Sequence, residues 1–73
     1  MIIKRKESAM DREKFARRLR ELRGERTQEK VARDLDIAQS SYAMYENGQR
    51  IPSDEKKIKL AEYYDTTVQD IFF

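Results

Sequence analysis

Residues 28–47 of this chain read QEKVARDLDIAQSSYAMYEN and have the pattern of two short helices joined by a tight turn. Each half carries apolar residues at the spacing of one helix face: Val31, Ala32 and Leu35 in the first half, and Tyr42 and Tyr45 in the second. Gly48 follows at the position just past a helix end, where positive φ favours glycine. Two helices held at a steep angle in this way are a standard means of placing one of them in a DNA major groove.

The remainder of the chain also has helical spacing. Phe15, Leu19 and Leu22 recur at i, i+4 and i+7, which predicts a first helix that Ser8 or Asp11 caps and Gly24 ends. The later helices are expected to follow three capping residues: Thr27, Ser53 and Thr67. The apolar residues of the fourth predicted helix are Ile58, Leu60, Ala61 and Tyr64. With one proline, two glycines and no alternating pattern beyond the first few residues, the sequence predicts an all-α domain of five short helices.

The first ten residues differ from the rest. Met1 to Ile3 are apolar and β-prone, and residues 4–6 form the basic run Lys-Arg-Lys. We therefore expect a short N-terminal arm over residues 1–10, either mobile or packed as an extended segment. A packed arm would leave the basic run able to approach phosphate groups. The other residues, 11–73, are expected to form a single domain with the two-helix unit at 28–47.

Composition argues against several classes of function. The 73 residues make one small domain without cysteine or histidine, which removes disulfides, thiolate nucleophiles and the commonest general base and metal ligand. The acidic pairs Asp34/Asp36 and Asp54/Glu55 fall at predicted helix ends, where carboxylates are expected for capping and dipole reasons. The sequence therefore indicates no enzyme, cofactor, metal site or small-molecule ligand. Because no apolar run approaches the roughly 20 residues of a membrane span and no signal peptide is visible, we expect a cytoplasmic protein.

The net charge of +2 conceals an asymmetry along the chain. Residues 1–33 contain twelve Lys/Arg and six Asp/Glu, a balance of +6, whereas residues 34–73 contain four and eight, a balance of −4. A basic half can face a polyanion while an acidic half faces solvent or a partner. The same distribution also fits a well-solvated helical surface, so charge alone leaves both interpretations open.

From Leu19 to Phe72 the chain resembles the Cro/cI-type (XRE-like) helix-turn-helix family of phage repressors and bacterial transcriptional regulators. The resemblance rests on the order and spacing of short elements: Leu22-Arg23, Thr27-Gln28-Glu29, Val31-Ala32, Leu35-x-Ile37, Glu46-Asn47-Gly48, Pro52-Ser53, Leu60-Ala61 and Val68-x-x-Ile71-Phe72. It implies a compact five-helix domain of the lambda-repressor type that binds double-stranded DNA.

The resemblance also implies a role for each part of the DNA-binding surface. The helix at 39–47 corresponds to the recognition helix of the family. Its outward positions match those that meet base edges: Gln39, Ser40, Ala43 and Met44. The positions at which family members contact the DNA backbone match the start of the second helix and the loop after the third. Because the recognition helix has no Lys or Arg of its own, cations elsewhere are also needed for affinity. The expected phosphate contacts are Gln28, Lys30, Arg33, Asn47 and Arg50.

Other matches and mismatches concern stability. Arg23 and Glu46 match a family ion pair that ties the first helix to the end of the third. Three positions depart from the family pattern: Asp36 replaces the usual glycine of the turn, Ala38 replaces the usual Ser/Thr cap of the third helix, and Lys57 replaces an apolar residue of the fourth. Asp tolerates the left-handed region better than most residues, at a cost of roughly 1 kcal/mol relative to glycine.

The C-terminal residues suggest self-association. Phe72 and Phe73 are large apolar groups at the end of the chain, and members of the family commonly dimerise through this region. We therefore expect a homodimer whose interface contains Tyr63, Val68, Ile71, Phe72 and Phe73. The sequence thus predicts a transcriptional regulator, a dimeric repressor that occupies a palindromic double-stranded operator. The alternative is an antitoxin or adaptor that uses the same fold mainly to bind another protein.

Overall fold

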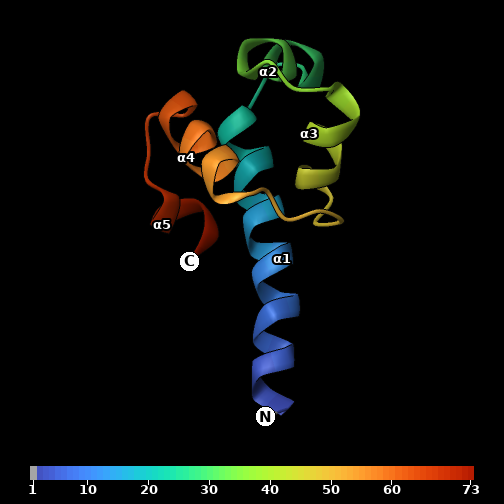
Figure 1. Cartoon of the computed structure of the whole chain (residues 1–73), viewed down its shortest axis with the longest axis vertical. Helices are drawn as coiled ribbons and strands as arrows, with labels where there is room; N and C mark the ends of the chain where they lie inside the picture. Colours follow the sequence, from blue (N-terminus) through green and yellow to red (C-terminus); the bar gives the residue numbers. More distant parts are fainter. Residues whose placement is uncertain (1) are drawn as a thin grey trace.

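The computed structural model describes the backbone of residues 2–73 and the side chains of residues 12–73 (Figure 1). Within that part of the chain there are five helices and no strand, as the sequence predicts. The helices are α1 (Ile2–Arg23), α2 (Gln28–Leu35), α3 (Gln39–Glu46), α4 (Asp54–Tyr63) and α5 (Val68–Phe72). The all-α, five-helix prediction is confirmed.

The C-terminal half of α1 is the centre of the domain. In Figure 1, α3 lies on one side of α1, α4 and α5 lie on the other, and α2 lies beyond its C-terminal end. Phe15 and Leu19 of α1 are buried against the other helices. The core that they join contains Val31, Ala32, Leu35, Tyr42, Tyr45, Leu60, Ala61, Tyr64, Ile71 and Phe72.

Side-chain caps start three of the helices, and all three were predicted. The hydroxyl of Thr27 accepts a hydrogen bond from the backbone N–H of Lys30 at 3.0 Å. Ser53 accepts one from Lys56 at 3.3 Å, and Thr67 accepts one from Asp70 at 3.0 Å. Each cap satisfies a backbone donor that the first turn of a helix leaves unpaired.

The structure differs from the sequence prediction at the N-terminus. Residues 2–10, expected to be a mobile or extended arm, form the first part of α1, while Met1 lies outside the described residues. No glycine or proline interrupts residues 2–23, and a Ser or Asp inside a helix is only mildly unfavourable, so neither Ser8 nor Asp11 has to start it. In Figure 1 this part of α1 stands clear of the rest of the domain. Although α1 has 22 residues, no helix in the described chain is long and apolar enough to cross a membrane.

A second difference concerns α4. Ile58, expected among its apolar residues, is 51% exposed. The inward stripe instead consists of Leu60, Ala61 and Tyr64 with Lys57 one turn earlier, because these positions share the i, i+3, i+4, i+7 spacing of one face. The Lys57 ammonium lies over the Phe72 ring, 5.4 Å from its centre. The aliphatic part of the side chain therefore covers apolar surface while the charge makes a cation–π contact.

The turn between α2 and α3 contains Asp36 and Ala38, two of the residues that depart from the family pattern. Asp36 adopts the left-handed conformation, with φ 59° and ψ 46°. Ala38 precedes α3 in an extended conformation and makes no side-chain cap. The two helices are therefore joined by a turn that contains one strained residue and leaves the first turn of α3 without a side-chain acceptor.

We predict that Asp36→Gly raises the free energy of unfolding by about 1 kcal/mol, because glycine has no Cβ to oppose positive φ. In a domain of this size that corresponds to an increase in Tm of about 4–8 °C, measurable by thermal denaturation followed by circular dichroism. Asp36→Ala is the matched control and should lower Tm, since alanine keeps the Cβ and loses the polar group. A lower Tm for the glycine variant would contradict the argument.

Candidate nucleic-acid interface

The side chains of α3 are divided between an inner and an outer face. Tyr42 and Tyr45 are buried against the core. The four residues expected to meet base edges face the other way: Gln39 and Ser40 are exposed, Met44 is 40% exposed and Ala43 is half-buried. The structure therefore brings these four side chains together on the solvent side of one rigid helix.

Glu46, the last residue of α3, holds that helix in place. Its carboxylate is 1% exposed and has a separate donor for each oxygen. Arg23 Nε of α1 lies 2.6 Å from Oε2, and Gln28 Nε2 of α2 donates to Oε1 at 2.9 Å. Arg20 of α1 donates to the Glu46 backbone carbonyl. The C-terminal end of α3 is thereby tied to both helices that precede it.

These contacts keep the buried carboxylate ionised. Burial by itself would raise the pKa of Glu46, but the hydrogen bonds from Arg23 and Gln28 outweigh it and hold the pKa below its ordinary value of 4.5. The Arg23–Glu46 pair is therefore a charged contact within the fold and is largely shielded from solvent. It contributes to the position of α3 without facing outward itself.

A second polar contact, absent from the sequence analysis, crosses the core from α3 to the end of α4. The hydroxyls of Tyr42 and Tyr64 lie 2.6 Å apart and are buried. Burial raises the pKa of both tyrosines, so both stay protonated and one donates to the other. Nothing in the local sequence signals this pairing, because the two residues are 22 positions apart.

The five expected phosphate contacts fall into two groups. Gln28, half-buried at the start of α2, uses its amide N–H to reach Glu46, while Asn47 and Arg50 are exposed in the loop after α3. Lys30 and Arg33 instead form ion pairs along α2, with Asp34 at 3.1 Å and Glu29 at 3.6 Å. These two cations lie on the outer side of α2, about half a turn of the helix away from Gln28.

Two of the expected dimer-interface residues lie in the core of the single chain, which corrects that assignment. Ile71 is fully buried, and the ring of Phe72 lies 5.2 Å from that of Phe15. Through these two residues the short helix α5 packs against α1. An ion pair between Arg18 of α1 and Asp70 of α5, at 3.0 Å, also joins the two helices. Ile71 and Phe72 are therefore unavailable to a second copy.

The other three expected interface residues remain at the surface to different degrees. Phe73 is 71% exposed, and Val68 is half-buried. Tyr63 is also half-buried, and its hydroxyl donates to Asp34 at 2.7 Å. Burial and this hydrogen bond raise the pKa of Tyr63 to about 12, so Tyr63 is a neutral donor that links α4 to α2.

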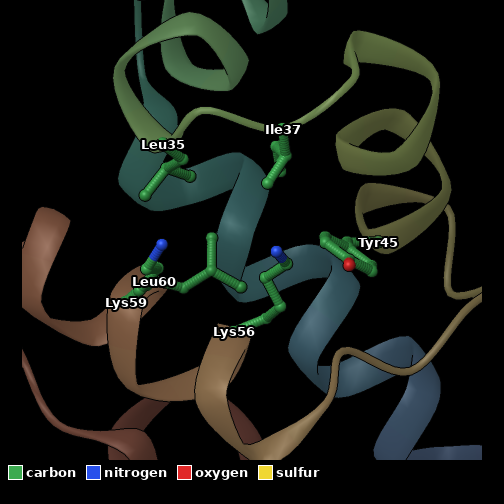
Figure 2. Close-up of a pocket in the computed structure, with 6 residues that line it drawn as sticks. All are labelled: Leu35, Ile37, Tyr45, Lys56, Lys59 and Leu60. Carbon is green, nitrogen blue, oxygen red and sulfur yellow. The ribbon is translucent and has the colours of Figure 1, made fainter.

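The helix-turn-helix unit packs on α4 around a small apolar hollow. Figure 2 shows Leu35 and Ile37 on one side of it, facing Leu60 of α4. Lys56 and Lys59 flank the hollow, and it is too narrow to hold a water molecule. An open depression of about 380 Å³ adjoins it beside Asp34 and Glu62. Within the described residues, no cluster of acidic side chains has the arrangement of a metal site.

A profile of the helix-turn-helix family matches residues 17–71. These residues include the complete α2–turn–α3 unit, α4 and most of α5. Comparison with curated proteins and with solved structures finds no match. The chain belongs to the Cro/cI-type helix-turn-helix family and is a DNA-binding regulator of that class.

We predict that Glu46→Gln lowers the free energy of unfolding by about 2 kcal/mol near neutral pH, because Arg23 loses its charged partner. The folded-state pKa of Glu46 is below its ordinary value of 4.5, so the ionised group stabilises the fold above that pH and the contribution is lost as pH falls through the lowered pKa. Urea denaturation at several pH values should therefore show a smaller acid loss in the variant than in the wild type.

Glu62→Gln is the control for this experiment, since it removes an exposed carboxylate from α4. It should leave both the stability near neutral pH and its acid dependence close to those of the wild type. Equal effects of the two substitutions would show that Glu46 acts only through net charge.

Proposed function

We propose that this protein is a sequence-specific repressor that reads the major groove of double-stranded DNA with the outer face of α3. The observation that carries the proposal is the position of Gln39, Ser40, Ala43 and Met44 on the outer face of a helix whose C-terminal end is held by Glu46. A helix that enters the major groove needs short or flexible side chains on its outer face and a rigid attachment on its inner face. α3 has both.

The chemistry of the outer face suits base edges. The side-chain amide of Gln39 can donate to N7 and accept from N6 of an adenine, which is the bidentate contact that amides make with that base. Ala43 and Met44 offer apolar contact to a thymine methyl group. Contacts to the DNA backbone are proposed for Gln28 at the start of α2 and for Asn47 and Arg50 in the loop after α3. Lys30 and Arg33 would contribute only by exchanging their carboxylate partners for phosphate.

Two copies are proposed to bind one operator. A two-fold dimer places two recognition helices about 34 Å apart, so that both reach major-groove segments on one side of the duplex. The symmetry of the dimer then requires a palindromic operator. Phe73, which follows α5, is the strongest candidate for the dimer contact because it is exposed and apolar. Val68 at the start of α5 and Tyr63 on α4 are further members. Occupation of the operator would block transcription.

The proposal is tested by selecting bound duplexes from a random pool and measuring affinity for the selected site. We predict that Gln39→Ala relaxes the preference at one base pair of each half-site by about 1–3 kcal/mol. Gln69→Ala, an exposed glutamine on α5, is the control and should leave the preference unchanged. Enrichment of no site would contradict sequence-specific reading.

Titration with salt distinguishes a DNA-binding regulator from a protein adaptor with the same fold. Affinity for random duplex should fall steeply between about 50 and 200 mM salt, because bound phosphates release counterions. An antitoxin or adaptor that acts through protein contacts alone would bind random duplex weakly at every salt concentration. That result would remove the proposed function.

The dimer makes a separate prediction. Sedimentation of the wild type at about 100 μM should show a dimer, because this concentration exceeds the dissociation constant of a moderately tight complex. Phe73→Asp should shift it to the monomer, since a carboxylate in an apolar contact is unfavourable. Ile51→Asp, at a similarly exposed isoleucine before α4, is the matched control and should not. A monomeric wild type with full operator affinity would refute the dimer.

A further inference from the structure

The first helix, α1, is rich in positive charge, whereas α3 has none. α3 itself reads QSSYAMYE and contains no Lys or Arg. Residues 12–23 of α1 contain six cations: Arg12, Lys14, Arg17, Arg18, Arg20 and Arg23. Four of these are directed to other parts of the fold: Lys14 to the Phe73 carbonyl, Arg18 to Asp70, and Arg20 and Arg23 to Glu46. Arg12 and Arg17 make no hydrogen bond or ion pair with the described side chains.

Arg12 lies where the loop after α3 packs on α1. Gly48 has a φ of +72°, and a Cβ at this position would lie 3.2 Å from the Arg12 carbonyl oxygen. The same position is 3.6 Å from the Arg12 Cβ. In Figure 1 the loop crosses α1 below the foot of α3. A glycine is needed here for its backbone conformation and for the close approach, and this contact places the base of the Arg12 side chain beside the loop.

Arg12 also continues the face of α1 that supports α3. Arg12, Ala16, Arg20 and Arg23 recur at helical i, i+4 and i, i+3 spacing, so they lie along one side of α1. Ala16 is buried, and Arg20 and Arg23 after it hold Glu46 at the end of α3. Arg12 is exposed and lies one turn beyond Ala16, beyond the end of α3. Gly48, which packs against it, lies between the exposed residues Asn47 and Arg50 in the sequence.

We infer that Arg12 is a phosphate-binding residue, which extends the DNA-backbone contact of the 47–50 loop onto α1. The inference rests on the proposed function, because it requires that the loop lies against a DNA strand. A guanidinium can donate two parallel hydrogen bonds to one phosphate, which suits a side chain that approaches the strand from a fixed helix. The contact supplies affinity from outside the helix-turn-helix unit and does not distinguish one base sequence from another.

The test is the salt dependence of binding by Arg12→Gln. One lost phosphate contact should reduce the slope of log K against log salt by about 1. Affinity at moderate salt should fall about fivefold, to a similar extent for the selected site and for random duplex. Arg12→Lys keeps the charge and should retain the slope. Neither substitution at Arg12 should unfold the domain, since Gly48 lies against the Arg12 backbone and Cβ, which both variants keep.

Arg17→Gln is the matched control. It removes the same charge from an exposed position of the same helix, but about 140° around its axis from Arg12. The slope should stay within error of the wild type. Equal losses in the two variants would show a general charge effect and overturn the site, as would an unchanged slope in Arg12→Gln when the wild type binds DNA normally. If the wild type binds no duplex, the proposed function fails together with the site.

Discussion

The buried carboxylate of Glu46 determines where α3 lies. An ionised carboxylate with no partner in a protein interior costs several kcal/mol, so its burial at the end of α3 requires donors within reach. Arg23 reaches it from α1 and Gln28 from α2. Moving α3 away from either helix would leave this charge incompletely satisfied. The position of α3, the proposed recognition helix, therefore follows from how α1 and α2 pack together.

The fold separates two requirements of DNA binding. Cations that bind phosphate supply affinity for any duplex, whatever its base sequence. α3 has none and presents an amide, a hydroxyl and apolar groups, whose contacts depend on the identity of a base. Residues 12–23 of α1 contain five arginines, and three of them, Arg18, Arg20 and Arg23, hold the domain together. In the proposed complex, sequence discrimination by α3 is therefore separate from the phosphate contacts, which come from α1, α2 and the 47–50 loop.

Much of this arrangement could be predicted from the sequence because its causes are local. Thr27, Ser53 and Thr67 each cap a helix through a backbone N–H three residues later, and Asp36 occupies a turn position that needs positive φ. The inward and outward faces of α3 follow from the spacing of its two tyrosines. These features depend on residues within one helical turn of one another.

The parts that the sequence did not predict depend on residues far apart in the chain. The sequence suggests a dimer contact for Phe72 because Phe15, the ring that it packs against, is far from it along the chain. The start of α1 was placed too late because Ser8 and Asp11 can cap a helix or lie inside one. Ile58 and Lys57 are adjacent, and only the packing of α4 on its neighbours decides which of them turns inward.

The hydroxyl pair of Tyr42 and Tyr64 has a consequence for how many ways the core can pack. Leucines at both positions would tolerate a shift of the end of α4 relative to α3, because shifted aliphatic contacts have similar free energies. A buried hydroxyl that loses its partner costs about 1–3 kcal/mol, so any shifted register is penalised at both residues. The pair therefore favours one position of the end of α4 relative to α3, and with it a single packing of the core.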